Sequence, residues 1–379
     1  LYIPTTAGLR NPLRDRIFVN ISKDVQETLP EIPNPDSDTI QIAREYLWQN
    51  IGHAHQNERL NRLKAYGIDK FIACHHEVGW REAGESFTLR DKPADSIGAD
   101  RLAEYSAFVR GLGYRFGTYT NYMDFAPVNA NWDEDVVCLN PDGTWKRAWP
   151  RCYTMKPLRA VEFEAYYAPR INALYGTNAQ YCDVHTAFKP WAHTDYDART
   201  PGAGMFKMQF NAYGRLLQNE SIAHQGPVFS EGNYHWFYAG LVDGNYATIL
   251  PYGDGWKIEP LVDFDLLKMH TKMTDFGMGF GEMYYGLNTN WWRVEASRHN
   301  PWFDRFTAAT IAFGHIGFLT YEWGFEATLK GYYQLQALQK RYTTIPVQEI
   351  RYHDGEDLVD TSAAILSDAY KRRHIFVEY

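Results

Sequence analysis

Two carboxylates, Asp183 and Glu231, stand where they could act together on one bond. Each comes at the end of an apolar run that is typical of a buried strand, at residues 179–184 and 226–231. The two runs are neighbours in chain order, and adjacent strands of a sheet lie about 4.8 Å apart. One carboxylate could then attack a carbon atom while the other, as a carboxylic acid, protonates the leaving oxygen. That division of labour is the chemistry of glycoside hydrolysis, with Asp183 as nucleophile and Glu231 as acid and base.

The residues around the two carboxyl groups favour different protonation states. Asp183 is followed by His185 and a polar stretch, which would keep the carboxylate ionised. Glu231 is followed by Tyr234 and Trp236, and aromatic crowding favours the protonated form that a general acid needs.

Further polar side chains stand beside aromatic rings at the ends of other strand-like runs. This combination suits a sugar, because a ring packs against the C–H face of a pyranose while Asp, Asn, His or Arg binds its hydroxyl groups. We predict that the substrate is bound by His75, His76, Trp80, Asn121, Asp124, His185, Trp236, Glu282, Tyr284, Trp292 and Arg293.

Metal-dependent hydrolysis is the competing chemistry. His53 and His55 have the His-x-His spacing of barrel metallohydrolases, and His75, His76 and His185 could add ligands. His53 and His55 fall inside a helical pattern, however, and adjacent residues such as His75 and His76 point to opposite faces of a strand. We therefore expect no catalytic metal and no cofactor. A serine nucleophile is also unsupported, because no Gly-x-Ser-x-Gly motif occurs.

Strand-like runs and amphipathic helical patterns alternate along the chain, and these elements must position the residues above. The strand-like runs are residues 16–22, 70–75, 114–120, 179–184, 226–231, 246–250, 278–284 and 315–321. The helical patterns are residues 40–66, 99–111, 157–175, 205–224, 262–276, 301–313 and 326–343. This order predicts an α/β fold, the (β/α)8 TIM barrel, whose active residues lie at the C-terminal ends of the strands. A doubly wound sheet would also alternate, but no Gly-rich phosphate loop follows the first strand.

The end of the chain differs from the rest, because residues 347–379 carry Asp/Gly turns between short strands. We therefore divide the chain into a catalytic barrel, residues 1–346, and the start of a C-terminal, β-sandwich-like domain, residues 347–379. A long insert at residues 124–156, rich in Trp and Pro, is of the kind that caps a site. Because the chain opens at Leu1 with neither an initiator Met nor a signal peptide, we expect a fragment of a longer, processed protein.

Composition restricts the partners. With 38 basic and 46 acidic side chains and a net charge of −8, the chain lacks the basic cluster that binding to nucleic acid requires. It also lacks the run of about 18 apolar residues that a membrane span requires. The four cysteines have no zinc-site spacing, and Cys138 and Cys152 flank a turn across which they could pair.

The residues around both carboxylates resemble the catalytic barrel of glycoside hydrolase family 101, the endo-α-N-acetylgalactosaminidases, with family 129 as a relative. The matching stretches are QYCDVH at 180–185 and PVFSEG at 227–232, followed by His235 and Trp236. The family's nucleophile is an Asp in a Tyr-x-Asp-Val strand and its acid/base a Glu on the next strand, so the resemblance implies these roles for Asp183 and Glu231. It also implies a downstream β domain and a secreted, cell-surface or periplasmic setting. The strand end at 118–122 is similar to that of α-galactosidase barrels.

The sequence therefore predicts a retaining glycoside hydrolase that removes an α-linked galactose or N-acetylgalactosamine from a glycan or glycoprotein by double displacement. Two alternatives stay open, a non-catalytic carbohydrate-binding barrel and a metal-dependent hydrolase. A separation of about 5–5.5 Å between the carboxyl groups would indicate retention, and about 6.5–9.5 Å inversion. The exact sugar, exo or endo action and the oligomeric state are open at this stage.

Overall fold

A computed structural model describes most of the chain, and every structural statement below concerns this part. The described residues are 3–12, 17, 19–23, 28, 34–51, 56–75, 89–232, 234–247, 304, 307–308, 310–312, 314–319, 324–343, 345, 347–372 and 374–379.

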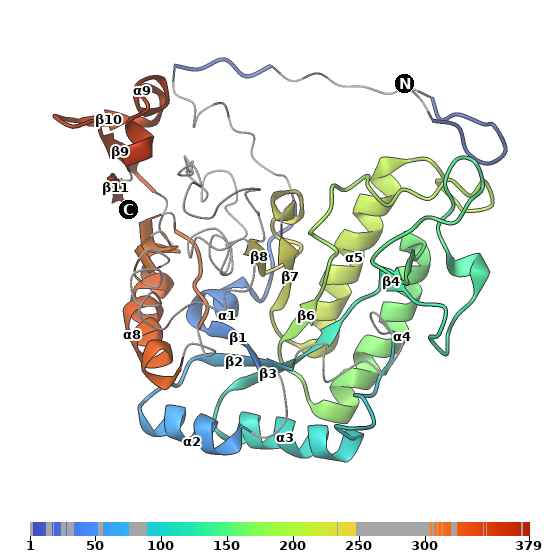
Figure 1. The fold of residues 1–379 in the computed structure, drawn as a ribbon, viewed down its shortest axis with the longest axis horizontal. Helices are drawn as coiled ribbons and strands as arrows, with labels where there is room; N and C mark the ends of the chain where they lie inside the picture. The colour runs from blue at the N-terminus through green and yellow to red at the C-terminus, as the bar shows by residue number, and fades with distance from the viewer. Residues whose placement is uncertain are drawn as a thin grey trace. The chain divides into compact units, whose positions relative to one another are not determined.

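The chain folds around a six-stranded sheet with the strand order β1-β2-β3-β6-β7-β8 (Figure 1). The strands are β1 (Leu47–Ile51), β2 (Phe71–His75), β3 (Arg115–Thr120), β6 (Gln180–Cys182), β7 (Val228–Gly232) and β8 (Gly244–Ala247). The pairs β2–β3, β3–β6 and β6–β7 are parallel. Every residue of β2 is buried, as expected for a parallel strand whose two faces are covered. The predicted α/β fold is therefore confirmed, while the closed eight-stranded barrel stays a prediction.

The first of two compact units comprises Leu1–Asp15 and Gln49–Val242. Its helices are α2 (Asn57–Ala65), α3 (Ala99–Gly111), α4 (Pro157–Tyr175) and α5 (Phe206–His224). Figure 1 shows these helices on the outer side of β2, β3 and β6. Helix α4 begins with Pro at its first position and ends at Gly176, whose φ of 60° is the left-handed conformation common at helix ends. Both α3 and α4 have the bounds that the sequence predicts.

The largest difference from the prediction lies at residues 40–66, where one long helix was expected. The structure instead has α1 (Ile40–Glu45), strand β1 and helix α2. Leu47 and Trp48 are adjacent and both buried, and a strand that is covered on both faces accommodates this pair. The first strand is thus β1 and not residues 16–22, of which Ile17, Val19 and Ile21 are highly exposed and belong to no strand.

The second unit comprises Arg16–Trp48 and Asp243–Tyr379. It contains α8 (Phe325–Tyr342) and an antiparallel sheet of order β10-β9-β11, made of β9 (Glu349–His353), β10 (Leu358–Asp360) and β11 (Ile375–Glu378), with α9 (Thr361–Leu366) and η9 (Ala369–Arg372). Phe318 forms an isolated parallel bridge with Trp48. The domain boundary at 346/347 stays a prediction. No helix in the described ranges is both long and apolar enough to cross a membrane.

The insert between β3 and β6 folds back on itself. Strand β4 (Asp124–Phe125) pairs with β5 (Tyr153–Thr154), and the turn η3 (Glu134–Val136) lies between them. Cys138 and Cys152 are both buried and form no disulfide. The Cys138 amide donates to the Thr154 carbonyl, whereas Cys152 turns back toward Trp149, so the two cysteines do not face each other.

Two glutamates, Glu164 of α4 and Glu220 of α5, are buried close together behind the sheet. Asn219 Nδ2 donates to Glu164 Oε2 at 3.0 Å, and Thr120 Oγ1 donates to Glu220 Oε1 at 3.4 Å. Glu220 Oε2 lies 3.0 Å from His224 Nε2. Burial, with the nearby charge of Glu220, raises the pKa of Glu164 to about 8. Glu164 is therefore largely protonated at neutral pH.

Glu164→Gln should flatten the dependence of stability on pH. The folded pKa of Glu164 lies above its usual value of 4.5, so the folded state holds the proton more tightly, and this stability falls as pH rises from about 4.5 to 8. Between these limits the free energy of unfolding of the wild type should fall by roughly 1 kcal/mol per pH unit more than that of the variant. Urea unfolding at several pH values measures this difference. The exposed Glu162→Gln is the control and should keep the wild-type slope; equal slopes in all three proteins would contradict the assignment.

Candidate active site

The register of β6 and β7 brings Asp183 and Glu231 to one edge of the sheet. Cys182 pairs with Ser230. The next residues are Asp183, directly after β6, and Glu231, within β7, so the two carboxylates lie on adjacent parallel segments. Side chains alternate along a strand, and register partners share a face. Asp183 and Glu231 therefore lie on the face opposite Cys182 and Ser230, and both are half-buried.

The carboxylate of Asp183 is held by two tyrosines. Tyr119 donates its hydroxyl proton to Oδ2 and Tyr181 donates to Oδ1, each at 2.8 Å. Tyr119 and Tyr181 are register partners on β3 and β6, with ring centroids 6.0 Å apart. One donor on each oxygen stabilises the anionic form and fixes the plane of the carboxylate. A nucleophile requires both properties.

Asn121 and Asp124 extend this network behind Tyr119. Asn121 Nδ2 donates to the Tyr119 hydroxyl at 3.2 Å and to Asp124 Oδ2 at 2.9 Å, while its Oδ1 accepts the amides of Met123 and Asp124 at 3.0 Å. Asp124 Oδ1 accepts the Trp149 amide at 3.2 Å. Burial raises the pKa of Asp124, and the hydrogen bonds from Asn121 and Trp149 oppose that rise. Both predicted binding residues are buried, so here they support Tyr119.

A strained turn follows Asp183. Val184 has a φ of 61°, and the His185 amide donates to the Asp183 carbonyl at 2.8 Å, which closes a γ-turn. A positive φ at a β-branched residue costs energy and is found mainly at functional sites. The turn sends the chain out of the sheet directly after the carboxylate.

His185 consequently packs toward the helices. Its ring meets that of Tyr213 on α5 edge to face, with centroids 4.5 Å apart, and the side chain is fully buried. Burial, with a smaller contribution from His193, lowers the pKa of His185 to about 3. The imidazole is therefore neutral, and its place in the core gives no support to a contact with sugar hydroxyls.

Hydrogen bonds also join the turn at Val184 to the end of β7. Thr186 Oγ1 donates to the backbone carbonyl of Glu231 at 2.5 Å, and the Thr186 carbonyl accepts the Tyr234 amide at 2.9 Å. The backbone beside each carboxylate is thus tied to the backbone beside the other.

The other predicted binding residues are placed differently or lie outside the described part. His75 ends β2 fully buried, and its register partner is Thr118. By alternation it shares the face of Thr120 and Cys182, and not that of Asp183. Trp236 falls in the turn η4 (His235–Tyr238), but its side chain is not among those described. Outside the described residues lie His76, Trp80, Glu282, Tyr284, Trp292 and Arg293.

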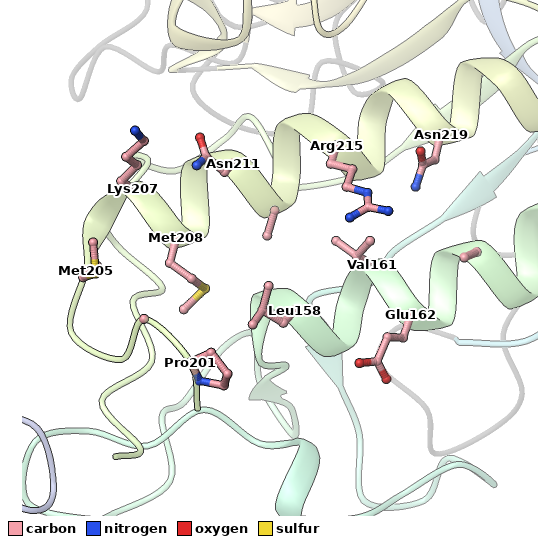
Figure 2. A pocket seen from close by; sticks show the side chains of 13 residues that line it. Leu158, Val161, Glu162, Pro201, Met205, Lys207, Met208, Asn211, Arg215 and Asn219 are labelled. Atoms are coloured by element: carbon pink, nitrogen blue, oxygen red, sulfur yellow. The ribbon is translucent and has the colours of Figure 1, made fainter. Parts of the chain in front are cut away.

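Two further features bear on the alternatives. Among the described residues, no three His, Cys, Asp or Glu side chains are grouped as metal ligands. A groove of about 820 Å³ lies between α4 and α5, with Leu158 and Met208 among its apolar lining and Lys207 and Arg215 projecting from α5 (Figure 2). None of the predicted site residues lines this groove.

Tyr119 and Tyr181 were not predicted as site residues, although one signal was present. Tyr181 precedes Asp183 by two residues, so strand alternation alone puts it on the same face. Tyr119 becomes a partner only through the register of β3 with β6, which joins positions 62 residues apart, a separation that the sequence does not encode locally.

Asn121→Ala should destabilise the protein strongly. The change removes the acceptor of the Met123 and Asp124 amides and the Asn121 donor to Asp124 Oδ2. A buried polar group that loses its partner costs about 1–3 kcal/mol. We expect a loss of about 3 kcal/mol in the free energy of unfolding, measured by denaturant titration. Asn140→Ala removes exposed hydrogen bonds in a hairpin and should cost less than about 1 kcal/mol. Similar losses in the two variants would refute the role of Asn121.

Comparison with known proteins supports the fold. No protein-family model matches the chain, and no curated protein matches its sequence. A ligand-free α-N-acetylgalactosaminidase from Bifidobacterium bifidum superposes with a TM-score of 0.63 at 13% identity, over 89% of this chain and 60% of that one. A family 36 α-galactosidase from Geobacillus stearothermophilus gives 0.52 at 8% identity, over 81% and 44%.

The chain thus spans between about two fifths and three fifths of these structures. At such low identities the likeness concerns the fold, and the chain has a fold found in glycoside hydrolases.

Proposed function

We propose that this chain is the catalytic part of a retaining glycoside hydrolase that acts on an α-linked galactose or N-acetylgalactosamine, in the manner of families 101 and 129. The observation that carries the proposal is the adjacent placement of Asp183 and Glu231, with Asp183 held by two tyrosine hydroxyl groups. The fold shared with an α-N-acetylgalactosaminidase and an α-galactosidase supports the choice of sugar.

In the first step the Asp183 carboxylate attacks the anomeric carbon, and the glycosidic C–O bond breaks. Glu231, as a carboxylic acid, gives its proton to the leaving oxygen. One oxygen of Asp183 becomes the ester oxygen of the glycosyl-enzyme, while the other keeps its tyrosine hydrogen bond. In the second step Glu231, now a carboxylate, takes a proton from water as that water attacks the anomeric carbon. The sugar leaves with its original configuration, and both side chains return to their starting states.

The tyrosines contribute by orienting the nucleophile. Tyr119 and Tyr181 hold both oxygens of Asp183 before the substrate binds, so the carboxylate does not rotate away from the anomeric carbon. Asn121 accounts for the position of Tyr119, because its Nδ2 donates to the Tyr119 hydroxyl. The whole network rests on strand ends, where positions are well determined.

Asp183→Asn should lower kcat/KM at least about 1000-fold on aryl α-galactosides or aryl α-N-acetylgalactosaminides, because the amide cannot form the glycosyl-enzyme. Glu231→Gln should lose most activity on poor leaving groups and much less on activated ones, which need no proton. The exposed Asp142→Asn serves as the control and should keep wild-type rates. NMR of the first product should show the α-anomer. A β-anomer would exclude retention, and sugar binding without turnover would indicate a carbohydrate-binding protein.

Tyr119→Phe and Tyr181→Phe should each lower kcat about 10- to 100-fold with little change in KM. Each removes one hydrogen bond to a charged group, worth about 1.5–3 kcal/mol, that orients the nucleophile and not the bound sugar. Steady-state kinetics with an aryl α-glycoside measures both constants. Tyr166→Phe removes a hydroxyl group from the exposed face of α4 and should behave as the wild type. An effect on KM alone would assign the tyrosines to sugar binding.

A further inference from the structure

Three aromatic rings, those of Trp191, Phe206 and Phe237, form a partly exposed cluster that we term the aromatic strip. Trp191 contacts Phe237 with centroids 5.8 Å apart at 80° and Phe206 with centroids 6.3 Å apart at 39°. Trp191 is 42% and Phe206 54% exposed, and Phe237 is half-buried. Contiguous exposed apolar surface is a mark of a binding site. Neither neighbouring ring lies parallel to that of Trp191.

The aromatic strip lies at the same end of the sheet as the two carboxylates. Trp191 belongs to the loop that follows β6, Phe206 is the first residue of α5, and Phe237 lies in η4 after β7. In parallel α/β units these segments all stand at the C-terminal ends of the strands.

A series of contacts connects the aromatic strip to the candidate active site. The loop after β6 is tied to Glu231 through Thr186, and the Tyr234 amide donates to the Thr186 carbonyl. Farther along the same loop, the Lys189 ammonium lies 5.9 Å from the centre of the Tyr234 ring. Two residues later Trp191 meets Phe237, which follows Glu231 by six positions. The strip therefore continues the surface that begins at the end of β7.

We propose that the aromatic strip is a subsite for the leaving part of the substrate, where the ring of Trp191 stacks on a pyranose of the glycan beyond the scissile bond. The inference rests on the proposed function and adds to it a requirement for an extended glycan. The strip continues from the β7 end, which carries Glu231, and the acid must lie beside the leaving oxygen. Lys189, exposed beside the strip, can donate to sugar hydroxyl groups.

A peptide is the competing occupant of this surface. Extended peptides bind by pairing with an exposed strand edge, helical peptides bind in an apolar groove, and Pro-rich peptides bind on aromatic-lined surfaces. The aromatic strip is made by a loop, the start of a helix and a short 3₁₀ turn, and these segments offer no strand edge. The position of the strip favours the pyranose, because it continues from the end of β7, beside the acid that protonates the leaving oxygen of a glycan.

The test compares three substrates that share the same α-linked sugar: the glycosyl fluoride, the sugar linked to a second pyranose, and the sugar linked to serine in a short peptide. The fluoride has no leaving-group ring, so it reports the reaction without the subsite. For Trp191→Ala we expect the ratio of kcat/KM on the disaccharide to kcat/KM on the fluoride to fall about 10-fold, chiefly through a higher KM. Trp191→Phe keeps a smaller ring and should show a smaller fall. Thermal unfolding checks that both variants fold.

Tyr66→Ala is the matched control, because Tyr66 is 53% exposed and ends α2 just before β2, at the opposite end of the strands. This variant should keep the wild-type ratio. An unchanged ratio in both Trp191 variants, or equal losses on all three substrates, would overturn the subsite. A loss confined to the peptide substrate would overturn the pyranose in favour of a peptide. If the wild type hydrolysed none of the three, the proposed function itself would fail, whatever the variants did.

Discussion

The hydrogen bonds from Tyr119 and Tyr181 to Asp183, one on each oxygen, are the contacts on which the candidate site depends. Both donors come from positions that the sheet itself aligns, because Tyr119 and Tyr181 are register partners and Tyr181 precedes Asp183 by two residues. Backbone pairing therefore sets the orientation of the carboxylate without any intervening loop. The pairing of β6 with β7 in turn places Glu231 next to Asp183. A carboxylate held in this way needs little reorientation when a substrate binds.

The two faces of the same strands serve different purposes. Tyr119, Tyr181 and Asp183 share one face, where the two tyrosine hydroxyl groups bind the carboxylate. Thr120 and Cys182 share the other face, where the hydroxyl group of Thr120 reaches Glu220 of α5. Burial raises the pKa of the Cys182 thiol, with a contribution from the charge of Glu220, which shows how closed this second layer is. Because side chains alternate along a strand, the residues of the candidate site and those that pack against α5 are neighbours in sequence but lie on opposite faces.

The sequence predicts features that depend on residues close together in the chain, such as the ends of helices and strands. The ends of α4 are marked by Pro157 and Gly176, and the carboxylates are marked by the apolar runs that they terminate. Strand β1 was missed because apolar residues continue at helical spacing through residues 40–66, and only insertion into the sheet buries Leu47 and Trp48 together. Tyr119 was missed because its partnership with Asp183 spans 64 residues. His185 was expected beside the carboxylate. The positive φ of Val184, which directs His185 toward Tyr213 instead, cannot be predicted from a residue pattern.

The γ-turn at Val184 has a consequence for how such a protein can change over evolutionary time. It stands at the boundary between two kinds of structure: strand register holds the carboxylates before it, and a loop that carries Trp191 follows it. A change of length after Thr186 would leave the β3–β6 pairing as it is, whereas one residue added between Tyr181 and Asp183 would move Asp183 away from both donors. Val184 thus separates a part of the chain whose position is fixed by strand pairing from a part that strand pairing does not constrain.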